Sequence, residues 1–219
     1  MKKVLVLCLV LFGFYNLKAQ EVFNAINSTY QQEGVFHRHV GFYLSMSVGP
    51  VFGSVTDDLG TYTMDMSGTG AQFDFKIGGA IKENLILHAT LISNVLPGPS
   101  IKISGNSSIK ASDNLTVGEA MLGGGLTYYI MPSNIFLSGT LGLGNFSIID
   151  SNDKNNNVST QRGFSMQLKI GKEWWISKKW GLGISLTYGK TNLTNKPGAG
   201  IVEKLDSNRF GILFNSTLN

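Results

Sequence analysis

The segment from Arg162 to Lys190 alternates large apolar residues with small or polar ones through two successive arms. The alternating sets are Phe164, Met166, Leu168 and Ile170 against Ser165, Gln167, Lys169 and Gly171, and then Trp180, Leu182, Ile184, Leu186 and Tyr188 against Gly181, Gly183, Ser185, Thr187 and Gly189. A period of two places each set on its own face of a β-strand. Only residues 177–179 separate the two arms. We therefore predict a β-hairpin with one strongly apolar face, a pattern typical of strands that meet lipid.

The start of the chain has the arrangement of a secretory signal peptide. Lys2 and Lys3 precede an apolar run over Val4–Tyr15, and Ala19 offers a small residue for cleavage. The run is shorter than the about 20 residues that a spanning helix needs, and no later segment reaches that length without charges. We expect residues 1–19 to be a signal peptide and residues 20–36, which show no clear period, to be an N-terminal periplasmic lead.

The composition argues against two other classes of protein. Without Lys2, Lys3 and Lys18, the 18 Lys and Arg against 14 Asp and Glu become 15 against 14, so the mature chain is nearly neutral. Nucleic-acid binding requires clustered basic charge, so no nucleic-acid partner is expected. The only cysteine is Cys8, inside the signal peptide, so we expect no disulfide framework.

Eight segments alternate in the same way, and the connections between them are of two kinds. The segments cover residues 40–49, 71–78, 85–92, 119–128, 135–144, 164–171, 180–189 and 210–217. The very short links are 82–84, 132–134 and 177–179, and the long ones are 53–69, 93–114, 150–161 and 191–207. Short turns on one side and long loops on the other are typical of outer-membrane barrels. We predict an all-β fold, an eight-stranded antiparallel up-and-down transmembrane β-barrel over residues 37–219.

Aromatic residues gather beside the short turns of the predicted barrel. This set is Tyr128, Tyr129, Phe136, Trp174, Trp175 and Trp180. Amphipathic rings concentrate at the two boundaries of a membrane, so we predict these six as membrane-interface aromatics. For Tyr129, Phe136 and Trp175 the alternation points inward, and the prediction rests on nearness to a turn alone.

Ionisable residues have the inward parity on several strands. They are Asp74, Lys76, His88, Glu119, Lys169 and Glu173. Eight strands leave an interior just wide enough for side chains to fill, and unpaired buried charge is costly. We therefore predict a polar network that plugs the lumen, with a gated narrow conduit for protons or ions as the alternative.

Other chemistry has little support in the sequence. His37 and His39 share one face of an extended segment, but no third ligand stands at metal spacing and no Ser or Asp is placed beside a His. The segment 150–157 lacks the Gly and the closing Glu of a calcium-binding loop and is interpreted as solvated. We predict no metal, no cofactor and no catalytic residues.

The last strand, from Arg209 to Asn215, has a polar residue, a glycine two positions on and an apolar Phe214. This ending, with the pattern from Val40 to Leu218, resembles the small outer-membrane barrels of the OmpA, OmpX and OmpW kind. The resemblance implies location in the outer membrane of a Gram-negative type bacterium, contact with outer-membrane lipid and insertion by the barrel insertion machinery. The match rests on a pattern and implies location far better than activity.

Three functions are compatible with that resemblance. The first is a monomeric, non-enzymatic scaffold that holds exposed loops for envelope integrity or surface contact, with the loop ligand unknown. The second is a narrow conduit for small apolar or ionic solutes, as in OmpW-like barrels. The third, a lipid-modifying membrane enzyme, has no motif in this chain.

Overall fold

A computed structural model describes residues 37–219 with the exception of residues 105, 153–156 and 199–200. The predicted signal peptide, residues 1–19, and the predicted periplasmic lead, residues 20–36, lie outside the described residues. Among the described residues, no helix is long and apolar enough to cross a membrane.

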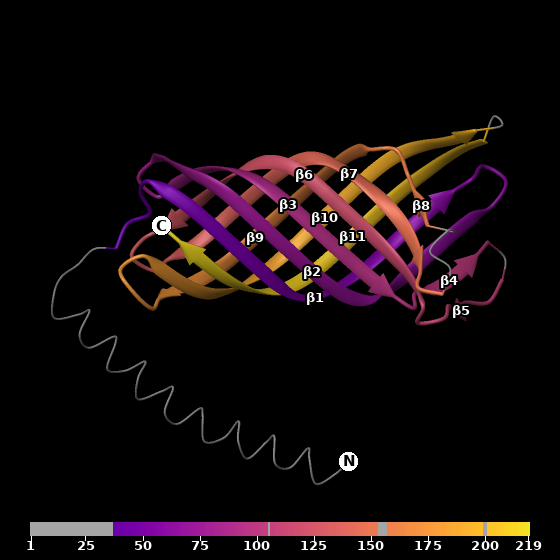
Figure 1. Ribbon diagram of the computed structural model, residues 1–219, viewed down its shortest axis with the longest axis horizontal. Coiled ribbons are helices and arrows are strands. Elements are labelled where there is room, and N and C mark those ends of the chain that lie inside the picture. Colours follow the sequence, from indigo (N-terminus) through magenta and orange to yellow (C-terminus); the bar gives the residue numbers. More distant parts are fainter. Residues whose placement is uncertain (1–36, 105, 153–156, 199–200) are drawn as a thin grey trace, which may run out of the picture. The chain divides into compact units, whose positions relative to one another are not determined.

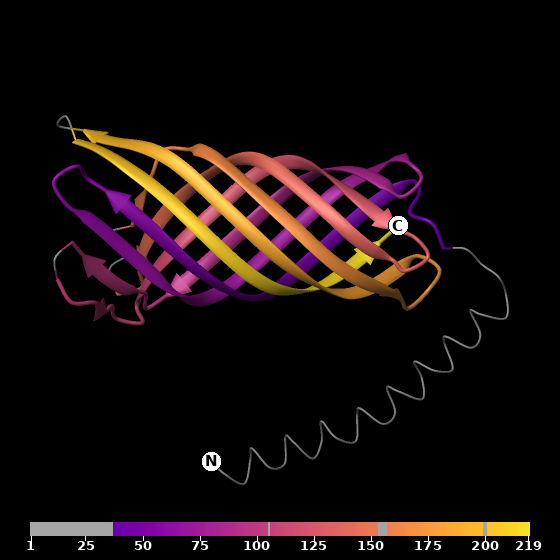
Figure 2. The ribbon, with the colours of Figure 1, turned by 180° about the vertical axis from the view of Figure 1, so that it is seen from behind.

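Eight long antiparallel strands form a closed barrel (Figure 1, Figure 2). In spatial order they are β1 (Phe42–Asp58), β2 (Thr63–Lys82), β3 (Leu85–Pro97), β6 (Leu115–Ile130), β7 (Ile135–Asp150), β9 (Gly163–Trp175), β10 (Trp180–Gly198) and β11 (Ile201–Leu218). Each strand pairs with its neighbours in the chain, and β11 pairs with β1 to close the wall. The predicted all-β, eight-stranded up-and-down barrel is confirmed, and closure leaves the eight-stranded wall without an unpaired edge in lipid.

The strands are strongly staggered around the barrel. Directly paired residues, followed once around the wall from Leu44, lead back to β1 at Ser54, ten residues farther along. A stagger of this size tilts the strands steeply and fixes the width of the interior. The tight wall needs small residues: a methyl group at Gly142 on β7 would overlap the carbonyl oxygen of Leu122 on β6. Inward glycines therefore let neighbouring strands coil closely.

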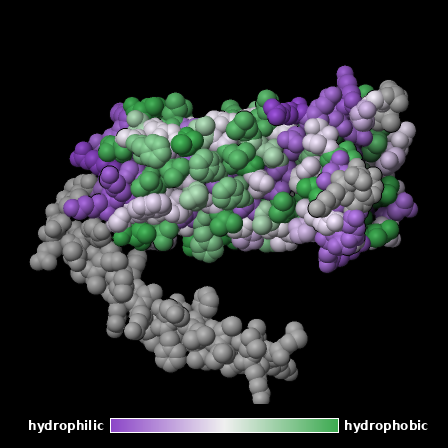
Figure 3. All heavy atoms as spheres, in the orientation of Figure 1, coloured by the Kyte–Doolittle hydropathy of each residue, from purple (hydrophilic) through white to green (hydrophobic). Residues whose placement is uncertain are grey.

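The outward residues form an apolar belt about ten residues tall. On β1, for example, the outward side chains are apolar from Phe42 to Phe52 and polar at Ser54, Thr56 and Asp58. Strands of about 9 to 11 residues cross a bilayer at this tilt. Figure 3 shows hydrophobic residues over the middle of the barrel and hydrophilic ones gathered toward both ends.

The strands continue well beyond this belt on the long-loop side. The predicted long loop 53–69 is wrong, because β1 and β2 run as a hairpin to Asp58 and Thr63. The predicted loop 191–207 is likewise wrong, because β10 and β11 stay paired out to Gly198 and Ile201. The outward residues become polar there while the ladder of hydrogen bonds continues.

The described parts of the remaining long connections contain three short strands. They are β4 (Ser100–Ile103), β5 (Ile109–Lys110) and β8 (Val158–Ser159). β4 pairs with the outer part of β2, and β8 pairs with β7. The long-loop side is therefore built largely from extended sheet.

The opposite end carries the predicted short turns. Asn84, between β2 and β3, and Asn134, between β6 and β7, have positive φ values of 62° and 53°. Asn tolerates this left-handed conformation better than most residues, which makes a turn of so few residues possible.

Candidate functional site

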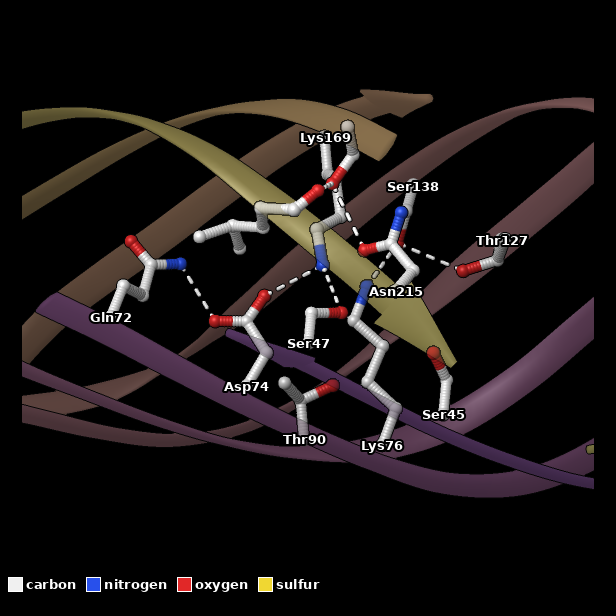
Figure 4. Close-up of polar contacts among 12 residues, drawn as sticks. Ser45, Ser47, Gln72, Asp74, Lys76, Thr90, Thr127, Ser138, Lys169 and Asn215 are labelled. Carbon is white, nitrogen blue, oxygen red and sulfur yellow. Dashed lines mark hydrogen bonds and ion pairs between the residues drawn. The ribbon is translucent and has the colours of Figure 1, made fainter. Parts of the chain in front are cut away.

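The structure places all six residues of the predicted polar network inside the barrel, each less than 7% exposed. Two ion pairs cross this interior. Asp74 on β2 lies 2.9 Å from Lys169 on β9, and Glu119 on β6 pairs with Arg209 on β11. Each pair joins strands that are not neighbours in the wall, so the side chains bridge the lumen. Figure 4 shows Lys169 and Asp74 pointing toward each other.

Hydroxyl and amide groups surround both ion pairs. Lys169 Nζ donates to Ser47 Oγ at 2.8 Å, and Gln72 Nε2 donates to Asp74 Oδ1 at 2.6 Å. Ser207 Oγ lies 3.2 Å from both oxygens of Glu119. A buried ion pair is tolerated only where such further hydrogen bonds satisfy its remaining polar atoms. These contacts satisfy part of the hydrogen-bonding capacity of each pair, and Nε and Nη2 of Arg209 are buried without a hydrogen-bond partner among the described residues.

Lys76 and His88 belong to a separate chain of contacts, of which Figure 4 shows Lys76, Ser138 and Thr127. Lys76 Nζ donates to Ser138 Oγ at 2.6 Å, and Thr127 Oγ1 donates to the same oxygen at 2.8 Å. His88 Nε2 lies 3.0 Å from Thr127 Oγ1. The carboxylate nearest in sequence, Asp74, pairs with Lys169 instead, so Lys76 is held by a hydroxyl group.

Glu173 lies at the short-turn end of the interior, among aromatic residues. Its carboxylate accepts hydrogen bonds from Thr217 Oγ1 at 2.7 Å and from Tyr129 Oη at 3.3 Å. The His39 ring stacks on the Tyr129 ring with centroids 3.4 Å apart, and His39 Nε2 lies 2.8 Å from Asn134 Oδ1. The segment before β1 thus closes this end of the lumen.

Three of the six predicted membrane-interface aromatics are wrongly assigned to the outer surface. Tyr129 and Phe136 are buried inside the barrel, where they pack with Tyr43 and Ile86. Trp175 also turns inward, with its ring centroid 4.9 Å from that of His39. The parity of a strand decides which way a side chain points, and nearness to a turn does not override it. The other three predicted aromatics, Tyr128, Trp174 and Trp180, are exposed on the outer surface.

An apolar layer covers the charged network on the long-loop side. Its buried members are Val51, Val55, Met66, Leu96, Val117, Phe146, Leu193 and Leu205. All of these residues have the inward parity. Val51 and Leu96 lie level with the last apolar residues of the belt, and Val55, Met66, Leu193 and Leu205 lie where the outward neighbours are polar. The interior therefore has three layers: an apolar layer at the loops, a charged layer at mid-height and an aromatic layer at the short turns.

The sequence analysis missed Arg209 as a member of the network. It treated Arg209 only as the polar residue of the last strand, although Arg209 alternates with the outward Phe210 and so has the inward parity. With Arg209, three cationic side chains, those of Lys76, Lys169 and Arg209, balance the three carboxylates of the network. Within the described residues, no three His, Cys, Asp or Glu side chains converge as a metal site.

Comparisons with known proteins identify the fold. No family model matches the chain, and no curated protein sequence matches it. The crystal structure of Neisserial surface protein A (NspA) is similar over 80% of this chain and 96% of its own, with 14% identity and a TM-score of 0.53. The outer membrane protein OprG from Pseudomonas aeruginosa matches over 83% and 98%, with 16% identity and a TM-score of 0.48. The outer membrane protease OmpT from Escherichia coli matches over 81% and 96%, with 10% identity and a TM-score of 0.42. The architecture is that of the small outer-membrane β-barrels.

Proposed function

We propose that this protein is a non-enzymatic outer-membrane barrel whose filled interior makes it a rigid scaffold for the hairpins on its long-loop side. The apolar belt supports contact with outer-membrane lipid, and the last strand supports delivery by the barrel insertion machinery. In this proposal the hairpins serve envelope integrity or surface contact.

The three-layered interior is the observation that carries the proposal. An ion that entered the lumen would first meet the apolar layer around Val55 and Phe146, where it would lose its hydration. It would then have to separate the Glu119–Arg209 and Asp74–Lys169 pairs. Both barriers favour a plug over an aqueous path, because eight strands leave no channel unless side chains rearrange.

The same burial argues against an enzyme. Ser138 beside Lys76, and Thr127 beside His88, are the contacts that most resemble an activated hydroxyl. All four residues are at most 5% exposed, so a substrate would have no access to these hydroxyl groups. The proposal therefore assigns Lys76 and His88 a structural role.

The hairpins offer the surface that a scaffold would present. The β1–β2 and β10–β11 hairpins are neighbours in the wall, since β1 pairs with β11, and the pairing continues out to Asp58 and Lys204. Four adjacent strands therefore extend beyond the apolar belt as one continuous sheet, so a partner would meet a preformed surface at low entropic cost.

Conductance of the refolded protein in a planar bilayer tests the proposal. We expect no steady ion current from the wild-type barrel. Because Glu119→Gln leaves Arg209 without its partner, that variant serves as the comparison for a disturbed plug. A stable, voltage-insensitive current from the wild type would overturn the scaffold and favour a conduit.

A conduit for small apolar solutes is the second candidate. The apolar layer supports it, because Val51, Leu96 and Leu193 would give such a solute a compatible lining at the loop end of the interior. The charged layer beneath opposes it. Uptake of an apolar dye into vesicles that contain the barrel separates the two candidates. The scaffold predicts the same uptake rate as in vesicles without protein. The conduit predicts faster uptake, which Val55→Trp would slow.

A further inference from the structure

A groove of about 400 Å³ lies on the outer surface at the short-turn end. It is lined by Arg38, Val40, Phe42, Lys178, Lys179, Leu218 and Asn219. The pairing of β1 with β11 begins at Leu44 and Leu218, so the residues before Leu44 continue past the end of β11. This step in the wall leaves a notch between the start of β1 and the turn from β9 to β10.

The notch has an apolar part and a cationic part. Val40 and Phe42 are 53% and 54% exposed and continue the outward face of β1 that forms the belt. Lys178 and Lys179 are exposed at the tip of the turn, and neither forms an ion pair with another described residue. The backbone N–H of Asn219 donates to the carbonyl of Lys179 at 2.9 Å, which holds this turn beside β11.

The position of the notch matches a membrane boundary. Trp180, directly opposite Leu218 in the ladder, and Trp174 are partly exposed at the same end of the barrel. Indole rings prefer the headgroup level of a bilayer. The apolar part of the notch would therefore face acyl chains, and the lysines would lie among the headgroups.

Charge at this end is strongly unbalanced. The charged side chains beyond the belt, among the described residues, are Arg38, Lys82, Lys172, Lys178 and Lys179 against Glu83. Glu83 pairs with Arg38 at 3.1 Å, and no described acidic side chain forms an ion pair with either turn lysine. A cationic rim beside exposed apolar residues complements a phosphate ester attached to acyl chains.

We propose that this notch binds an anionic phospholipid of the leaflet on the short-turn side, with the phosphate at Lys178 and Lys179 and the acyl chains against Phe42 and Leu218. The inference goes beyond the scaffold function. Of the proposed function, it depends only on the contact between the apolar belt and lipid. A barrel that conducts could hold the same lipid, so failure of the plug would leave this proposal intact.

Quenching of tryptophan fluorescence by brominated lipids tests the site. Trp174 and Trp175 are replaced by phenylalanine so that Trp180, beside the notch, is the reporter. The protein is refolded into phosphatidylcholine vesicles that contain a fixed fraction of brominated phosphatidylglycerol or of brominated phosphatidylcholine. Each lysine near an anionic surface adds about fivefold to binding. With two lysines, we expect the wild-type turn to prefer phosphatidylglycerol by about 25-fold in relative binding constant, and 1 M salt to remove the preference.

Charge-matched variants give the controls. Lys178→Gln with Lys179→Gln should abolish the preference, whereas Lys102→Gln with Lys110→Gln, the same change at the loop end, should keep it. Both lysines of the turn are exposed, so their replacement should not affect folding. An unchanged urea midpoint of unfolding verifies this. Equal quenching by the two lipids in the wild type, or a preference that survives in the turn variant, would overturn the site.

Discussion

Asp57 provides a sharp test of how the hairpins are attached to the interior. It has the inward parity on β1, beyond the apolar belt, and is 8% exposed. Its Oδ1 atom is buried without a hydrogen-bond partner. Burial, and then the nearby charges of Glu203 and Asp58, raise the pKa of the Asp57 carboxyl from 3.8 to about 6.

The sign of the pH effect follows from this shift. Between pH 4 and pH 6 the folded state binds more protons at Asp57 than the unfolded state, so stability falls as pH rises through that window. The shift corresponds to about 3 kcal/mol if it is fully expressed. Water at the barrel mouth screens the carboxylate, so we expect about 1–2 kcal/mol.

Asp57→Asn removes this cost, and hydrogen exchange measures the result. Local opening of the hairpin is measured by the protection factors of backbone amides over residues 51–58 and 63–66. Protection factors correct for the intrinsic pH dependence of exchange. We expect the variant to raise protection about 5- to 30-fold at pH 7.5 and to leave it nearly unchanged at pH 4. The matched control is Asp113→Asn, at an exposed carboxylate. Equal gains at both pH values, or a loss of protection at pH 7.5, would refute the reasoning.

Three further predictions test the interior, the belt and the topology. Glu119→Gln leaves a buried guanidinium unpaired and should lower the free energy of unfolding in urea by about 3–5 kcal/mol, whereas Glu83→Gln at the exposed pair with Arg38 should cost less than about 1 kcal/mol; equal costs would contradict the plug. Ile184→Arg should cost about 2–4 kcal/mol in refolding titrations, and a cost no greater than that of Ile184→Ala would show that this face does not meet lipid. An epitope inserted after Gly60 should bind antibody on intact cells and one after Lys178 should not, and reversed accessibility would invert the topology.

The direction in which each side chain of the belt points could be predicted from the sequence. Successive residues of a strand point to opposite faces, and only one of the two sets is apolar enough to face lipid. Ile184 is exposed and Ser185 is buried, as their alternation predicts. The same rule was sufficient for Tyr129 and Phe136, where proximity to a turn gave the wrong answer. Parity is a property of the backbone, whereas clustering of aromatics near a turn is only a statistical preference.

The length of the strands was harder to predict because the pattern inverts where the sheet leaves lipid. Within the belt the outward residues are apolar and the inward ones polar, but beyond it Val55 points inward while Thr56 and Asp58 point outward. A strand prediction that requires apolar outward residues ends at this inversion, and the residues beyond it are then assigned to a loop. The inverted alternation itself was present in the sequence.

The partners within the interior could not be predicted from the sequence. Asp74 lies two residues from Lys76 on β2, yet its ion-pair partner is Lys169 on β9. The stagger of ten residues around the barrel decides which inward residues lie at the same height. The alternating pattern of the individual strands does not predict that stagger. Arg209 and Glu119, on β11 and β6, meet for the same reason.

The order of the three interior layers links the plug to the proposed scaffold. The apolar layer is contributed by β1, β2, β3, β6, β7, β10 and β11, the strands that carry the long connections outward. Residues such as Val55 and Leu205 therefore pack inward directly beneath the projecting hairpins, and the charged layer supports them from below. Opening a path through the lumen would remove the packing on which the hairpins rest. Conduction and rigid presentation of the hairpins thus compete for the same side chains, and a variant that gains conductance should also lose protection in the β1–β2 hairpin.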